Sequence, residues 1–116
     1  MVSYPTNINA FKLNDWLNSK EENPIIIDVR ENSELEIAQF PLDFIHIPIS
    51  KVSLDYVTTK INSLIDKKLL VLCHMGVRSY SFGQWSLDHN IVNEIWNLEG
   101  GIDGWSKYID QTIPRY

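Results

Sequence analysis

Two short apolar runs constrain the fold of this chain more than any other feature. Residues 24–29 and 69–72 carry β-branched and other apolar side chains almost without interruption. A strand with one face in water alternates polar and apolar residues, whereas an uninterrupted apolar run is typical of a strand buried on both faces of a parallel sheet. We therefore expect a parallel sheet covered by helices on both faces.

The rest of the chain alternates between helical and extended patterns. Asn9 and Ser50 are suitable helix caps, because their side chains can accept hydrogen bonds from unpaired backbone N–H groups. The expected helices cover residues 10–18, 50–64, 79–89 and 102–109, and the expected strands cover 24–29, 44–47, 69–72 and 91–98. Strands that alternate with helices predict an α/β fold, whose ligands bind at the carboxyl ends of the strands.

Length and charge narrow the possible roles. A chain of 116 residues has room for one domain, which we expect to span residues 1–116. Its 15 acidic and 10 basic residues give a net charge of −5, which argues against a surface that binds nucleic acid or anionic lipid. No apolar run approaches the ~20 residues of a membrane span, and the first residues lack a secretory pattern. We expect a cytoplasmic protein with no nucleic-acid or membrane partner.

The single cysteine lies where chemistry is expected. Cys73 directly follows the run 69–72 and precedes the third expected helix. Unpaired N–H groups at a helix N-terminus stabilise a thiolate, which is the nucleophilic form of cysteine. Gly76 would let the loop bend closely around the sulfur, and Arg78 would add positive charge. From the spacing alone, Cys73 is either a reactive nucleophile or a small core residue.

Metal binding and disulfide formation are not expected. One cysteine forms no internal disulfide and supplies no Cys-rich zinc site, and the three histidines show no ligand spacing. His46, which lies in the expected strand 44–47, is predicted to be a hydrogen-bonded structural residue.

Four sequence blocks, taken together, closely resemble single-domain rhodaneses. The blocks occur in the order of that family and cover residues 26–31, 45–48, 72–79 and 97–105. The resemblance implies a three-layer α/β sandwich with a small parallel sheet of about five strands and helices on both faces. It also implies a sulfurtransferase that needs no cofactor.

The resemblance assigns roles to the loop. The Cys73 thiolate would take a sulfane sulfur from a small anionic donor such as thiosulfate and become a persulfide. The sulfur would then pass to a thiophilic acceptor, which is cyanide in vitro and a thiol or a sulfur-carrier protein in the cell. The residues implied to cradle the sulfur and bind the substrate are His74, Met75, Gly76, Val77, Arg78 and Ser79.

Two other functions are alternatives to sulfur transfer. Rhodanese-like domains can serve as docking or sensing modules without turnover, often after losing the cysteine, and the presence of Cys73 counts against this. Related phosphatases and arsenate reductases carry one more residue between cysteine and arginine. The shorter loop from Cys73 to Arg78 favours a pocket of the size of a sulfur atom.

Charged residues beside the second strand have several possible roles. Asp28 could brace the loop by pairing with Arg78, cap a nearby helix, or join a surface ion pair. Arg30, Glu31 and Glu34 are expected to form solvated pairs.

The rim of the site is expected to involve the loop and the end of the chain. His74 is predicted to lie at an exposed rim rather than to act as a general base, and Met75 to form an apolar lip that shields the persulfide. Arg115 and Tyr116 resemble the tail of rhodanese domains that accompany ubiquitin-like activating enzymes, which would place them near a partner surface; the alternative is a frayed terminus. Gly83 should cost its helix ~1 kcal/mol unless it permits close packing.

Overall fold

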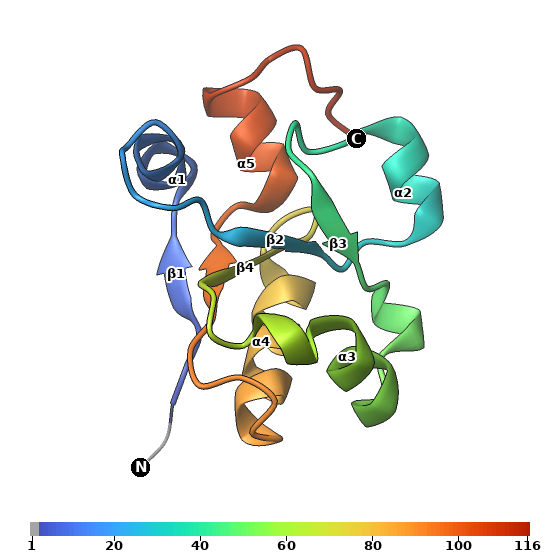
Figure 1. Ribbon diagram of the computed structural model, residues 1–116. Helices are drawn as coiled ribbons and strands as arrows, with labels where there is room; N and C mark the ends of the chain where they lie inside the picture. Colours follow the sequence, from blue (N-terminus) through green and yellow to red (C-terminus); the bar gives the residue numbers. More distant parts are fainter. Residues whose placement is uncertain (1–2) are drawn as a thin grey trace.

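Five parallel strands form one sheet in the computed structural model, which describes residues 3–116 (Figure 1). Met1 and Val2, part of the expected domain, lie outside the described residues. The strands are β1 (Thr6–Ile8), β2 (Ile25–Asp28), β3 (Phe44–His46), β4 (Leu69–Leu72) and β5 (Trp96–Leu98). Their order across the sheet is β1-β5-β4-β2-β3, and every neighbouring pair is parallel. The predicted α/β fold with a parallel sheet of about five strands is confirmed.

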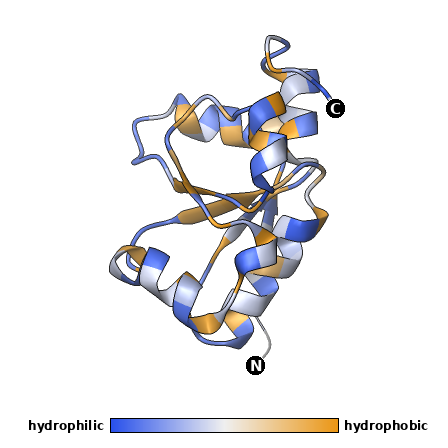
Figure 2. Cartoon of the chain, turned by 90° about the vertical axis from the view of Figure 1, so that its right-hand side faces the viewer, coloured by the Kyte–Doolittle hydropathy of each residue, from blue (hydrophilic) through white to orange (hydrophobic). Residues whose placement is uncertain are grey.

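Helices cover both faces of this sheet, which makes three layers. The helices are α1 (Ala10–Leu17), α2 (Asn32–Ile37), α3 (Leu54–Ile61), α4 (Val77–Asp88) and α5 (Gly101–Tyr108). One apolar core lies between the sheet and α1 with α5, and a second lies between the sheet and α3 with α4. Figure 2 shows the hydrophobic strands between the two helical layers.

The central strand β4 shows why its sequence is apolar throughout. Leu70 and Leu72 point into the core beneath α1 and α5, whereas Leu69 and Val71 point into the core beneath α3 and α4. All four side chains are at most 1% exposed. Cys73 continues this alternation, so its side chain faces α4.

The expected helix 50–64 is interrupted. Residues Ile49–Lys51 form a short 3₁₀ helix, and α3 begins only after Ser53, whose side chain accepts a hydrogen bond from the backbone N–H of Tyr56. Ser50 is not the cap, because its hydroxyl donates to the Glu31 carboxylate at 2.5 Å. A second 3₁₀ helix, Asn62–Leu64, follows α3.

Other element boundaries differ from the expected ones. Only Trp96–Leu98 of the expected strand 91–98 is extended in the sheet, and these three residues are the ones that pair with β1. The short elements β1 and α2 were not predicted. Helix α4 begins two residues before the expected helix 79–89 and ends at Asp88, and Asn90, just after the His89 C-cap, adopts the left-handed conformation with φ 56°.

Gly83 permits close packing of helix α4 against its neighbours. A Cβ atom at this position would lie 3.0 Å from Pro5 Cγ and 3.2 Å from Ile95 Cγ2. Helix α4 can therefore approach the N-terminal segment and the residue preceding β5 closely.

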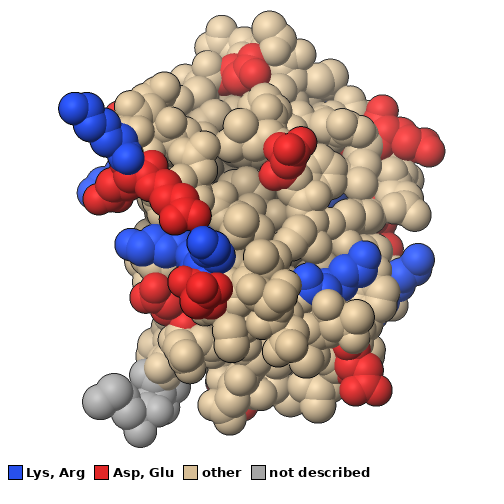
Figure 3. Space-filling view, in the orientation of Figure 1, with Lys and Arg blue, Asp and Glu red and all other residues tan. Residues whose placement is uncertain are grey.

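The surface carries mixed charges. On the face shown in Figure 3, acidic and basic side chains lie beside one another, and the basic ones do not gather into one area. Within residues 3–116, no helix has the length and apolar character needed to cross a membrane.

Candidate active site

The sulfur of Cys73 lies in a cradle of backbone N–H groups. Cys73 follows β4 at the carboxyl edge of the sheet and is 1% exposed. The N–H of Gly76 donates to Sγ at 3.1 Å, and the N–H of Ser79 donates to it at 3.3 Å. Gly76 has φ +93°, and a Cβ atom there would lie 3.0 Å from the backbone nitrogen of Gly100. Glycine at this position thus allows both the left-handed turn and the close approach of the loop.

The N-terminus of α5 holds the opposite side of the loop. The N–H of Ile102 donates to the carbonyl of Cys73 at 2.9 Å, and the N–H of Asp103 donates to the carbonyl of His74 at 3.1 Å. These bonds direct the loop carbonyls toward α5 while Gly76 and Ser79 direct their N–H groups toward the sulfur. Both the strand-to-helix turn and the packing of α5 therefore produce the cradle.

A buried polar pair lies beside the sulfur. The Ser79 Oγ is 3.2 Å from Cys73 Sγ, and the Ser79 hydroxyl donates to Asn97 Oδ1 at 2.5 Å. Ser79 is fully buried and Asn97 is 2% exposed. Sequence reasoning placed Ser79 in the loop but missed Asn97; the available signal was an amide side chain in the middle of an apolar strand.

Arg78 forms an ion pair with Glu34 from α2. Its two terminal nitrogens donate to the two carboxylate oxygens at 2.8 and 2.7 Å. The hydrogen bonds from Arg78 lower the pKa of Glu34 from 4.5 to about 2, and the same bonds raise the pKa of Arg78. The expectation that Glu34 forms only solvated pairs is wrong, because α2 places this carboxylate against the loop.

Asp28 does not pair with Arg78. Its carboxylate instead accepts bonds from the side chain of Arg30, at 2.8 Å from Nη2 and 3.1 Å from Nε. Both side chains are fully buried, so the expectation of a solvated Arg30 is also wrong. Burial opposes the charge of Arg30, but its hydrogen bonds with Asp28 and Tyr116 together raise its pKa. Asp28 thus supports the edge of the sheet through Arg30, two residues away, instead of bracing the loop directly.

His46 and Glu31 complete this edge. His46 Nε2 lies 2.6 Å from the Arg30 carbonyl oxygen, so the predicted hydrogen-bonded structural role is confirmed. Glu31 is the N-cap of α2: its side chain accepts from the backbone of Glu34, and Glu34 accepts from the N–H of Glu31 at 2.9 Å. This reciprocal capping fixes the start of the helix that carries Glu34.

The end of the chain packs against the site. The Tyr116 hydroxyl accepts from Arg30 Nη1 at 3.1 Å and donates to Glu34 Oε1 at 3.0 Å. Its ring stacks on His74 with the centroids 3.9 Å apart and 10° between the planes. His74 is therefore half-buried, which corrects the expected exposed position. Arg115 pairs with Asp103 at 2.9 Å, so the tail is docked in this structure and not frayed.

The tip of the loop is apolar and open. Met75 is 53% exposed and Val77 is 72% exposed. Beside them lies a hollow of about 390 Å³ lined by Asn7, Met75, Gly76, Val77, Tyr80, Ser81, Asn97, Glu99 and Gly100. The position of Met75 is compatible with an apolar lip, whose shielding of a persulfide stays a prediction.

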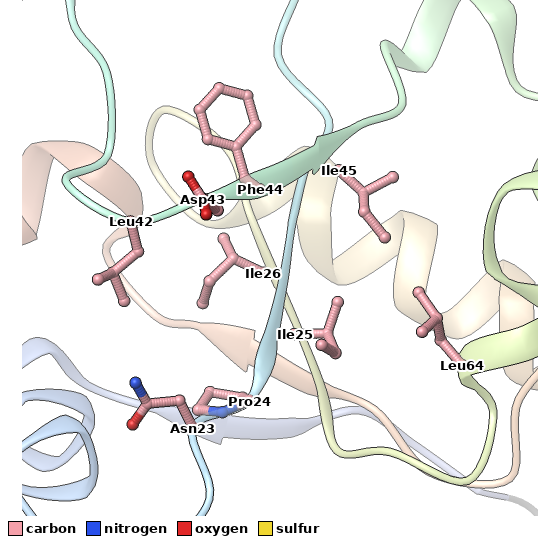
Figure 4. A pocket seen from close by; sticks show the side chains of 9 residues that line it. All are labelled: Asn23, Pro24, Ile25, Ile26, Leu42, Asp43, Phe44, Ile45 and Leu64. Atoms are coloured by element: carbon pink, nitrogen blue, oxygen red, sulfur yellow. The ribbon is translucent and has the colours of Figure 1, made fainter.

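The hollow shown in Figure 4 lies elsewhere. It measures about 420 Å³ and is lined mainly by apolar side chains, among them Ile25, Phe44 and Leu64. These line the amino ends of β2 and β3, whereas Cys73 follows the carboxyl end of β4. This hollow is therefore not part of the cysteine site.

The structure shows no cluster of metal-ligating side chains in its described part. Between residues 3 and 116, no three His, Cys, Asp or Glu side chains lie close enough together to hold a metal ion.

Comparisons with known proteins show the family to which this chain is similar. The family model described as a rhodanese-like domain matches residues 12–108. The chain is 34% identical over 108 residues to rhodanese-like/PpiC domain-containing protein 12 of Arabidopsis thaliana, covering 86% of this chain and 35% of that protein. It is 32% identical over 114 residues to the adenylyltransferase and sulfurtransferase UBA4 of Debaryomyces hansenii, covering 94% of this chain and 25% of that protein.

A solved structure also matches most of the chain. The rhodanese-related protein of Thermoplasma volcanium superposes with a TM-score of 0.67 and 32% identity, covering 88% of this chain and 91% of that one. The two curated relatives above are much longer, since this chain spans only 35% and 25% of their lengths. The match of the family model to most of the sequence shows that the chain belongs to the rhodanese-like domain family.

Proposed function

We propose that this domain is a persulfide-forming sulfurtransferase in which Cys73 carries the sulfur. The observation that supports this most directly is the pair of backbone N–H groups, from Gly76 and Ser79, that donate to Sγ. Such donors stabilise negative charge on sulfur both before and after transfer, and they are held in place before the reaction begins. A relative named as a sulfurtransferase matches nearly the whole chain, which supports the same proposal.

The first half of the reaction loads the cysteine. The Cys73 thiolate attacks the outer sulfur of a small anionic donor such as thiosulfate, and a new S–S bond forms. The S–S bond of the donor breaks, and sulfite leaves with its electron pair. The product is a Cys73 persulfide whose negative charge lies on the terminal sulfur.

The second half of the reaction unloads it. A nucleophilic acceptor attacks the terminal sulfur, the persulfide S–S bond breaks, and the electron pair returns to Cys73 as a thiolate. Because Cys73 is the single cysteine of residues 1–116, no second thiol within this domain can resolve the persulfide. The acceptor is therefore external: cyanide in an assay, and a small thiol or a sulfur-acceptor protein in the cell.

Mass spectrometry of the intact protein tests this proposal. Incubation with thiosulfate should add the mass of one sulfur atom, and cyanide should remove it and release thiocyanate. Cys73→Ser should do neither. Equal behaviour of the wild type and Cys73→Ser would refute the proposal, and a wild type that takes up no sulfur would leave a docking or sensing module as the better reading of this fold.

A further inference from the structure

The hydroxyl of Ser79 has two acceptors within reach and only one proton. It lies 3.2 Å from Cys73 Sγ and 2.5 Å from Asn97 Oδ1. If the hydroxyl donates to the amide, only its oxygen lone pairs face the sulfur; if it donates to the sulfur, the amide oxygen loses its donor. The direction of this one hydrogen bond therefore decides whether the Cys73 sulfur receives a hydrogen bond from the Ser79 hydroxyl or faces only its oxygen lone pairs.

The orientation of the Asn97 amide is fixed by its other contacts. Its Nδ2 lies 3.2 Å from the carbonyl oxygen of Gly76 and 3.0 Å from Asn7 Oδ1. A backbone carbonyl only accepts, so the amide must present its nitrogen to Gly76. The amide oxygen must then face Ser79, and the short Ser79–Asn97 contact requires that the Ser79 hydroxyl donates to it.

We propose that Asn97 is a positioning residue that holds the Ser79 hydroxyl proton away from the Cys73 sulfur. This inference rests on the proposed function, since it concerns the nucleophile of that reaction. A Cys73 thiol can donate its proton to the Ser79 oxygen. A Cys73 thiolate receives hydrogen bonds from the Gly76 and Ser79 backbone but none from the hydroxyl.

This arrangement has a chemical consequence. A thiolate that receives more hydrogen bonds is easier to form but is a weaker nucleophile, because nucleophilicity falls as the basicity of the sulfur falls. Because the Ser79 hydroxyl donates to the amide oxygen of Asn97, the thiolate keeps only two donors, the backbone N–H groups of Gly76 and Ser79. This preserves the reactivity of the thiolate toward a sulfane sulfur. Loss of the amide oxygen frees the hydroxyl to turn toward the thiolate.

The ion pairs around the cysteine loop do not depend on the Ser79–Asn97 hydrogen bond. The charged and titratable groups around the loop are Arg78 on α4, Glu34 on α2, His74 in the loop, Glu99 after β5, Asp103 on α5 and Tyr116 at the end of the chain. Among the hydrogen bonds of residues 3–116, those of these side chains do not involve the side chains of Ser79 or Asn97. Substitution of Ser79 or Asn97 therefore leaves the ion pairs around the sulfur intact.

The test is the rate of alkylation of Cys73 by iodoacetamide as a function of pH, measured on the full chain. Asn97→Leu should move the midpoint of the profile to lower pH, with an increase in rate of about three- to tenfold below the wild-type midpoint, because the freed hydroxyl donates to the thiolate. Ser79→Ala should leave the midpoint unchanged or move it to lower pH, because it removes only oxygen lone pairs from the sulfur. In the double variant, Asn97→Leu should have no further effect, because no hydroxyl remains.

A matched control is available on the same helix. Ser86 is fully buried on α4 and donates to the Phe82 carbonyl at 2.9 Å, away from the sulfur. Ser86→Ala therefore reports what the loss of any buried hydroxyl of α4 does, and it should leave the alkylation profile within twofold of the wild type.

Three results would overturn the inference. They are a shift to higher pH in Ser79→Ala, the absence of a downward shift in Asn97→Leu, and an effect of Asn97→Leu that persists in the Ser79→Ala background. If Asn97→Leu does not fold by circular dichroism, the smaller change Ser79→Ala decides the question by the direction of its shift. Alkylation needs no sulfur donor, so these results stand independently of whether Cys73→Ser abolishes sulfur transfer.

Discussion

Arg78, in the first turn of the helix that follows the cysteine loop, is clamped to Glu34 by two hydrogen bonds of 2.8 and 2.7 Å. The contact joins the cysteine loop to α2, and the same carboxylate also accepts from the Tyr116 hydroxyl and the Glu31 N–H. The positive charge that the sequence places beside Cys73 is therefore already paired. In the proposed reaction, attraction of an anionic donor would depend on the backbone N–H groups of the loop together with a guanidinium that a carboxylate partly neutralises.

Glu34 should make the free energy of unfolding of the domain depend on pH between 4.5 and 2. Because pairing with Arg78 lowers the pKa of Glu34 from 4.5 to about 2, its contribution is present above pH 4.5 and is lost as the pH falls toward 2. Arg78 is 34% exposed, so solvent screening reduces this contribution to about 1–2 kcal/mol. Urea unfolding should show Glu34→Gln less stable than the wild type by that amount at pH 7.

The same measurement at low pH checks the assignment. Near pH 2 the difference between Glu34→Gln and the wild type should shrink toward zero. Glu22→Gln is the control, because its pair with Lys67 is long, at 3.4 Å, and exposed. A difference between wild type and Glu34→Gln that stays constant from pH 7 to pH 2 would contradict a role for this carboxylate charge.

The buried Asp28–Arg30 pair should be far more costly to break than the surface pair of Asp103 and Arg115. Asp28→Asn leaves a fully buried guanidinium without its counter-charge, and we expect a loss of about 3–5 kcal/mol in the free energy of unfolding. Asp103→Asn should cost less than about 1 kcal/mol, because Arg115 is 54% exposed. Denaturant titration of both variants measures the difference, and similar losses would mean that burial does not set the strength of the Asp28 contact.

Gly101 should be required for the shape of the cysteine loop. It has φ +61°, and a Cβ atom there would lie 2.3 Å from the His74 carbonyl oxygen and 2.6 Å from that of Cys73. Gly101→Ala must therefore separate α5 from the loop whose carbonyls it binds, and we expect sulfur loading from thiosulfate to fall at least about tenfold. Gly104→Ala, in the same helix with open space around it, should load normally. Normal loading by Gly101→Ala would show that the contact with α5 does not organise the cradle.

Gly83 and Gly104 should respond oppositely to alanine. Both are helical, and alanine is favoured over glycine in a helix by about 0.5–1 kcal/mol. Gly104→Ala should gain this amount, because no atom outside its own stretch of helix lies within 4 Å of the new Cβ. Gly83→Ala should gain nothing or lose stability, because its Cβ meets Pro5 and Ile95. Thermal unfolding distinguishes the two variants. A stabilised Gly83→Ala would show that Pro5 and Ile95 can move to accommodate the added methyl group.

Local sequence patterns predicted much of the fold. The apolar runs of β2 and β4 and the Asn9 cap, whose side chain accepts from Lys12 N–H at 2.9 Å, depend on neighbours within a few positions. The elements that were missed, β1 and α2, contain three and six residues, too few to show a clear period of burial. They form because β5 and the sheet edge provide partners for them.

Patterns among neighbouring residues were enough to predict a parallel sheet and a single cysteine that follows a buried strand at the start of a helix. Those properties come from the burial pattern and backbone preferences of adjacent residues. The partners of the side chains at the site depend on tertiary packing: Arg78 pairs with Glu34, 44 positions away, and Ser79 bonds to Asn97, 18 positions away. Ion pairs and hydrogen bonds form between groups a few ångströms apart in space, and such distances follow from the packing of whole elements and not from spacing along the chain.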